Sequence, residues 1–131
     1  IDKWISKLSD HGFNMISLSD TIGSATPSMI NEVYSYFSAK YSNIMFGLHL
    51  HTHPNSWREK IDASFDSGCI RIDGAIQGFG GCPMASDKMI GNMPTEKIFS
   101  YCQEKGLDSG INPLKFEVAY NYASDIFLNY H

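Results

Sequence analysis

The sequence has little positive charge, no long apolar run and few cysteines, and each shortage excludes a class of protein. Its 10 Lys and Arg residues are outnumbered by 14 Asp and Glu, so the net charge of −4 leaves no basic footprint for nucleic acid. No apolar stretch approaches the ~20 residues of a membrane-spanning helix. The three cysteines, Cys69, Cys82 and Cys102, are odd in number and lack zinc-finger spacing, which favours free thiols in a reducing, cytoplasmic compartment.

A recognisable beginning is also missing. No signal peptide is visible and the first residue is Ile rather than Met, so we expect Ile1 to be the start of a fragment. The 131 residues are the size of one domain, and a hydrophobic content of 43% is enough for a real core. The sequence therefore predicts a single folded domain over residues 1–131.

Apolar periodicity and turn residues divide the chain into alternating helices and strands. The pattern predicts strands over 13–18, 44–51 and 69–73, and it predicts helices over 1–11, from 26, from 54 to 67, from 94 and over 113–130. Residues 77–93 are expected to form one long glycine-rich loop. We expect the last helix to bury an apolar face formed by Phe116, Ala119, Tyr120, Ala123, Ile126, Phe127 and Tyr130.

Strands separated by amphipathic helices indicate an α/β fold with a parallel sheet and right-handed crossovers. Ligands in such folds gather beyond the carboxyl ends of the strands, where three polar loops are expected here. A closed eight-stranded barrel needs at least ~200 residues, and three parallel strands alone would leave two edges unpaired. The chain is therefore expected to form either a small open sheet or part of something larger.

Three histidines stand at the end of the strand predicted over 44–51. Side chains on a strand alternate between its two faces, so His49, His51 and His53 would share one face. Imidazoles gathered in this way are typical of a metal site; they suit Zn, Cu, Fe and Ni, and added oxygen ligands allow Mn or Mg. His53 is the weakest candidate for a third ligand, because Pro54 breaks the strand next to it.

Four segments occur in order along the chain: Ile16–Gly23, His49–His51, the Gly-Gly-Cys-Pro stretch within 78–83, and Gly91–Asn92. Together they resemble the C-terminal part of the 3-hydroxy-3-methylglutaryl-CoA lyase family. That family belongs to the metal-dependent TIM-barrel lyases and Claisen-condensing enzymes. The resemblance covers nearly the whole chain and implies the C-terminal part of a TIM barrel, namely strands 6–8 and a terminal helix.

The resemblance also implies roles for particular residues. His49 and His51 match the two metal-binding histidines of the family, and Asn92 matches a residue at or near the metal. Cys82 matches a catalytic cysteine on a mobile glycine-rich loop, and Asp20 matches an acidic residue that faces the site. His49 is the candidate base for the substrate hydroxyl, and the Cys82 thiol is the candidate proton donor to the enolate carbon.

The chain departs from the family pattern at three places. Relatives usually carry Asp, Thr, an aromatic residue and Gly after the second histidine, where this chain has residues 52–55, Thr-His-Pro-Asn. The stretch from Cys82 to Asn92 is about one residue longer than in better-known lyases. An Arg-Asp pair that the family places on the first strand is absent, so the metal site of the isolated chain is expected to be incomplete and the fragment inactive.

By resemblance, the reaction is cleavage of 3-hydroxy-3-methylglutaryl-CoA to acetoacetate and acetyl-CoA with a divalent metal, Mg or Mn by family analogy, although the ligands also allow Zn. The expected partners are a CoA thioester substrate and either a second copy of the chain or the missing half of the barrel. Two alternatives stay open. One is a condensing relative of the isopropylmalate or homocitrate synthase type; the other is a non-catalytic half-barrel fragment that self-associates.

Overall fold

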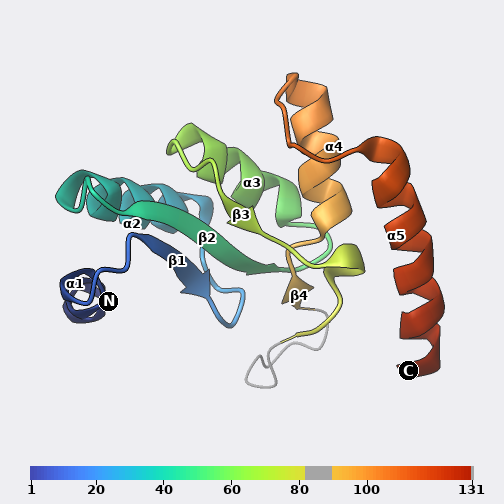
Figure 1. Ribbon diagram of the computed structural model, residues 1–131, viewed down its shortest axis with the longest axis horizontal. Helices are drawn as coiled ribbons and strands as arrows, with labels where there is room; N and C mark the ends of the chain where they lie inside the picture. Colours follow the sequence, from blue (N-terminus) through green and yellow to red (C-terminus); the bar gives the residue numbers. More distant parts are fainter. Residues whose placement is uncertain (82–89, 131) are drawn as a thin grey trace.

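A computed structural model describes residues 1–81 and 90–130 of the chain (Figure 1). The elements follow in the order α1 (Asp2–Asp10), β1 (Met15–Asp20), α2 (Pro27–Lys40), β2 (Met45–Thr52), α3 (Trp57–Asp66), β3 (Ile72–Asp73), the 3-10 turn η1 (Ile76–Gly78), β4 (Gly91–Asn92), α4 (Thr95–Lys105), α5 (Pro113–Phe127) and the 3-10 turn η2 (Leu128–Tyr130). Among these residues, no helix combines the length and the apolar character that crossing a membrane requires.

The helix ends are set by local side-chain chemistry. The Thr26 hydroxyl accepts a hydrogen bond from the Met29 amide at 3.3 Å, and proline follows as the first residue of α2. The same pattern starts α5, where the Asn112 side chain accepts from the Lys115 amide at 3.1 Å. A glycine marks the C-terminal end of α4. The helix stops at Gly106, whose φ of 67° is a left-handed conformation that favours glycine.

The sheet is parallel at its centre, as the alternating pattern predicts. β2 lies between β1 and β3, and both pairings are parallel. The β1–β2 register sets Asp20 opposite Leu50, and the β2–β3 register sets His49 opposite Asp73. The predicted α/β class is confirmed, and the ends of all three strands meet at one edge of the sheet.

The two faces of β2 differ in character. Phe46, Leu48 and Leu50 are 2–3% exposed and belong to the core with residues of α2 and α3. Figure 1 shows these two helices side by side over one face of the sheet. The alternating residues of β2, including His49 and His51, project to the opposite face.

Two predicted elements differ in the structure. The third strand is predicted over 69–73, but only Ile72–Asp73 is strand, because the Cys69 amide still bonds the Ser64 carbonyl at the end of α3. The predicted loop over 77–93 contains η1 at its start and β4 at its end, and β4 pairs antiparallel with β2. A two-residue strand carries too little periodicity to be read from sequence.

The buried face predicted for the last helix is wrong. α5 has no buried residue among the side chains that the structure describes, and that of Tyr130 lies outside them. The helix is attached through single contacts, including Phe116 against Phe99 and Phe127 stacked on Phe79. Its apolar periodicity identifies an apolar side but gives no information about the surface that would cover it.

Two neighbouring residues of β2, one on each face of the strand, test which face is buried in the core. Phe46→Ala removes a buried ring that packs near the rings of Phe37 and Tyr41, and we expect it to lower the free energy of unfolding by about 3–5 kcal/mol. Met45→Ala, at a side chain that is 49% exposed, should change it by less than about 0.5 kcal/mol. Urea unfolding measures both; equal losses would contradict the assignment of the faces.

Candidate metal centre

His49 and His51 lie next to each other near the carboxyl end of β2. Their ring centroids are 5.3 Å apart with an interplanar angle of 74°, as the alternation of a strand predicts. His51 is buried, whereas the side chain of His49 is 38% exposed. The structure therefore brings together the two residues expected to be the imidazole ligands, and one of them is open to a ligand from outside.

The ring of His51 is held by the main chain of the neighbouring strand. Its Nδ1 lies 2.9 Å from the carbonyl oxygen of Asp20. Because a carbonyl can only accept, Nδ1 must carry the hydrogen, and the lone pair is then on Nε2. A metal-binding histidine is usually oriented in this way, by a hydrogen bond from its other nitrogen.

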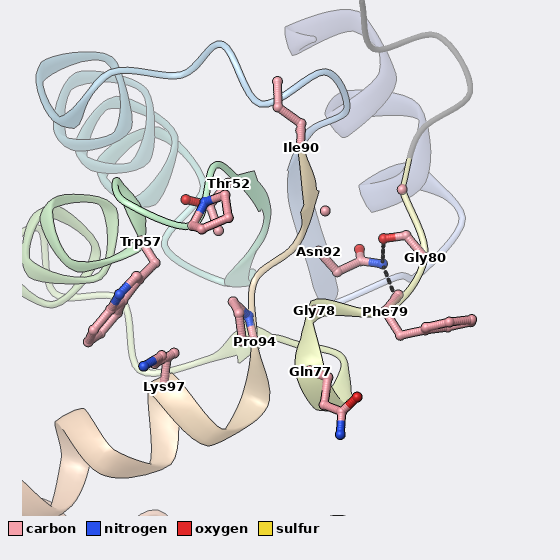
Figure 2. A pocket seen from close by; sticks show the side chains of 13 residues that line it. Thr52, Trp57, Gln77, Gly78, Phe79, Gly80, Ile90, Asn92, Pro94 and Lys97 are labelled. Atoms are coloured by element: carbon pink, nitrogen blue, oxygen red, sulfur yellow. Dashed lines mark hydrogen bonds between the residues drawn. The ribbon is translucent and has the colours of Figure 1, made fainter. Parts of the chain in front are cut away.

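Asn92 lies opposite His51 in the antiparallel pairing of β4 with β2. Its amide nitrogen donates to the carbonyl oxygens of Phe79 and Gly80 at 2.9 and 3.0 Å (Figure 2). Both hydrogens are thereby used within the glycine-rich segment, and the amide oxygen is the atom suited to a cation. β4, absent from the predicted elements, is what brings Asn92 to the histidines.

A cavity of about 610 Å³ opens beside Asn92 (Figure 2). It lies between the end of β2 and the start of α4, with Trp57 and Lys97 on one side and the backbone of residues 78–81 on another. Neither His49 nor His51 lines it. The cavity is therefore adjacent to the candidate centre, and Asn92 is the residue that the two share.

Asp20 is placed differently from the other predicted residues. It stands opposite Leu50, on the face of the sheet away from the imidazoles. Its carboxylate accepts from the amides of Ser24 and Ala25 at 2.9 and 3.1 Å and from Lys60 Nζ at 2.9 Å. The structure thus shows the carboxylate forming a turn and a buried ion pair; only the main-chain oxygen of Asp20 reaches the site, and its catalytic role stays a prediction.

Lys60 is a buried cation whose three donors all have acceptors. Its Nζ lies 2.9 Å from Asp20 Oδ2, 3.0 Å from the Gly23 carbonyl oxygen and 2.8 Å from the His51 carbonyl oxygen. The side chains of the pair are only 4% and 7% exposed. α3 therefore ties the loop after β1 to the main chain of His51.

Asp73 is a site residue that the sequence analysis missed. Its Oδ2 is 3.9 Å from His49 Nδ1, and it accepts a hydrogen bond of 2.7 Å from the Ser17 hydroxyl. The hydroxyl in turn accepts from Arg71 Nη2 at 2.6 Å. The signal was available, because Asp73 ends the third predicted strand just as the histidines end the second.

The remaining candidates lie elsewhere. Cys82 falls in residues 82–89, outside the described residues, so its predicted role is not tested. Cys69 and Cys102 are buried, and burial raises the pKa of both thiols. His53 follows the end of β2, and its Nδ1 accepts from the Asn55 amide at 3.4 Å.

The donors present fit part of a site for a divalent ion. Within residues 1–81 and 90–130, no group of three or more His, Cys, Asp or Glu side chains converges on a common point. The candidate set is two imidazoles and one amide oxygen, whereas Mg²⁺ requires six ligands. The rest must come from the substrate, from water or from residues beyond those described.

The chain has a parallel α/β sheet with two imidazoles near the carboxyl end of its central strand. This arrangement is typical of α/β proteins that bind a metal ion at that edge of the sheet. The sequence profile of the HMGL-like family matches residues 2–121, and the chain belongs to this family. Among curated relatives, the (R)-citramalyl-CoA lyase of Chloroflexus aurantiacus is 29% identical over 79% of this chain and 32% of its own length. The hydroxymethylglutaryl-CoA lyase YngG of Bacillus subtilis is 28% identical over 79% of this chain and 34% of its own length.

Solved structures agree on the fold. The HMG-CoA lyase of Bacillus subtilis superposes with a TM-score of 0.83 and 25% identity over 94% of this chain and 41% of that one. An HMG-CoA lyase of Acinetobacter baumannii, solved with coenzyme A and 3-methylmalate, superposes with a TM-score of 0.73 and 29% identity. This match covers 85% of this chain and 36% of that one. The chain thus has the fold of a TIM-barrel fragment and spans about a third of the length of the curated relatives.

Lys60 provides a test of how the site is held. Lys60→Met leaves the buried Asp20 carboxylate without its cation, and we expect a loss of about 3–5 kcal/mol in the free energy of unfolding. The control Lys40→Met removes an exposed ion pair with Asp2 and should leave unfolding by urea almost unchanged. Equal, small effects of the two substitutions would show that Lys60 does not hold the loop.

Proposed function

We propose that the chain carries the metal-binding part of a carbon–carbon lyase that cleaves a 3-hydroxy-3-methylglutaryl-CoA-like thioester to acetyl-CoA and an oxo acid. The observation that carries the proposal is the His49–His51 pair at the end of β2, with Asn92 opposite His51. Membership of the HMGL-like family and the names of the relatives support the reaction class. Because the chain spans about a third of those relatives, the activity belongs to a complete site.

In this proposal His49 and His51 would hold a divalent ion through Nε2, and Asn92 would hold it through its amide oxygen. When bound, the ion supplies Lewis acidity that makes a substrate hydroxyl easier to deprotonate. The amide oxygen favours a harder ion such as Mn or Mg, as in the family the chain resembles, while the imidazoles also suit Zn. The His51–Asp20 hydrogen bond sets the hydrogen of the neutral ring on Nδ1, which would leave the Nε2 lone pair for the ion.

The proposed cleavage moves one proton and one electron pair. His49 Nε2 takes the hydroxyl proton, a carbonyl forms at that carbon, and the electrons of the broken carbon–carbon bond pass to the thioester enolate. The Cys82 thiol gives a proton to the enolate carbon, and one proton transfer from His49 to Cys82 restores both groups. A nitrogen lone pair serves one partner at a time, so His49 would release the ion when it takes the proton, while His51 and Asn92 would still hold the ion.

A second acyl group has equal support from the comparisons. The citramalyl-CoA lyase is as similar to this chain as the hydroxymethylglutaryl-CoA lyases are. Both substrates are tertiary alcohols β to a thioester, so the same residues would serve both. The condensing alternative uses the reverse reaction, in which acetyl-CoA and a 2-oxo acid are joined.

We further propose that the partner is the remainder of a barrel. In the described sheet β1 pairs with β2 on one side only. An apolar groove of about 510 Å³ runs beside it, lined by α1, β1 and α2. A parallel strand on this edge, with its helix in the groove, would cover both the free strand edge and the apolar side chains.

The experiment compares the 131-residue chain alone with the chain joined to the N-terminal part of the Bacillus subtilis relative that the alignment leaves uncovered. Each protein is incubated with Mn²⁺ and one of three substrates or substrate pairs: hydroxymethylglutaryl-CoA, citramalyl-CoA, or acetyl-CoA with a 2-oxo acid. Mass spectrometry follows the acyl-CoA products. We expect the joined protein to form acetyl-CoA by cleavage and the chain alone to be inactive.

Histidine variants of the joined protein identify the residues. His51→Ala should lower turnover at least ~100-fold, because both the ligand and its anchor to Asp20 are lost. His53→Ala, two residues away and engaged with Asn55, should change it by less than ~3-fold. The proposal fails if the joined protein cleaves neither thioester, or if the two substitutions have the same effect.

A further inference from the structure

Behind His49 lies a row of polar side chains that the proposed reaction does not use. They come from the two strands that flank β2: Ser17 lies in β1, Arg71 just before β3, and Asp73 in β3. We propose that these three, called here the Asp73 cluster, position His49 with its hydrogen on Nδ1 and its lone pair on Nε2. The inference deepens the proposed function and rests on it for its purpose, although its test does not need turnover.

The carboxylate of Asp73 is held at both oxygens. Oδ2 accepts the hydrogen of the Ser17 hydroxyl at 2.7 Å, and Oδ1 lies 3.7 Å from Arg71 Nη2. The same Nη2 donates to the Ser17 hydroxyl oxygen at 2.6 Å. Because a guanidinium can only donate, the single hydroxyl hydrogen is directed to Asp73. The carboxylate cannot turn without breaking a contact to another strand.

Gly47 makes room for the arginine. It stands beside Ser17 in the β1–β2 register, and a Cβ atom there would come within 3.1 Å of Arg71 Cζ and Nε. Glycine within a strand weakens it and often marks a place where another group approaches closely. The guanidinium therefore lies against the backbone of β2 at Gly47, two residues before His49 and on the same face of the strand.

The effect on His49 is electrostatic. Asp73 is the direct partner of His49 across β2 and β3, and the Nδ1–Oδ2 distance of 3.9 Å is that of an ion pair rather than a hydrogen bond. An ionised carboxylate accepts and never donates, so it favours the ring form that presents N–H toward it. Both imidazoles of the centre would then offer Nε2, His51 through a carbonyl and His49 through a carboxylate.

The test is long-range ¹H–¹⁵N NMR of the histidine rings in the 131-residue chain, at a pH where they are neutral and with no metal or substrate added. We expect His49 to be mainly the Nδ1–H form. Asp73→Asn and, separately, Ser17→Ala should shift its tautomer ratio toward Nε2–H by about two- to fivefold. His51 is the internal control, because its partner is the Asp20 carbonyl and its ratio should not move.

A second readout is affinity for Co²⁺. Asp73→Asn should weaken it about 10-fold, and the control Asp10→Asn, an exposed carboxylate on α1, should leave it unchanged. Should one variant fail to fold, the other still gives the tautomer ratio. The inference is overturned if wild-type His49 is mainly Nε2–H, or if neither variant changes its ratio. A failed lyase assay with the expected tautomers would refute the proposed function alone.

Discussion

The register of β2 between its two parallel neighbours is the constraint on which the rest of the structure depends. It sets Asp20 beside Leu50 and Asp73 beside His49. A shift by one residue would exchange the faces of the strand, bringing Phe46 out of the core and His49 into it. Burial of the apolar face therefore fixes where the imidazoles point, and the stability of the core and the geometry of the site have one cause.

The two imidazoles are supported in different ways. His51 is buried, and its ring donates to the Asp20 carbonyl. Lys60 donates to the carbonyl of His51 and to that of Gly23, in the loop after β1. His49 is more open and faces the carboxylate of Asp73. In the proposed centre, the buried ring of His51 would stay on an ion, and the more accessible ring of His49 could exchange a proton. A buried ion pair adds little net stability, but removing one partner lowers the free energy of unfolding strongly because the other charge is left unpaired.

Much of the fold follows from periodicity, because apolar alternation and helix caps act locally. The parallel order, the helix starts at Pro27 and Pro113, and the shared face of His49 and His51 were all predictable in this way. The pattern could not supply β4, because two residues have no period. Nor could it supply the contact between the Asp20 carboxylate and Lys60, because the two residues lie 40 positions apart in the chain.

Other features depend on partners that a sequence pattern cannot identify. Asp73 ends a predicted strand, but its partner His49 is identified only when β3 is set beside β2, since the register makes the two residues neighbours. The apolar side of α5 contacts Phe79 and Phe99, but none of the helix residues is buried in the described part of the chain. The remainder of a barrel, proposed above as the partner, would supply a surface for this side of α5.

The most direct measurement of the central claim counts the imidazoles around one bound ion. Pulsed electron paramagnetic resonance of Mn²⁺ added to the chain with ¹⁵N-labelled histidine should show two coupled nitrogens. One coupling should disappear in His49→Ala and in His51→Ala, and both should remain in His53→Ala. A spectrum without nitrogen coupling, or one that neither substitution at positions 49 and 51 alters, would contradict a metal centre built on β2.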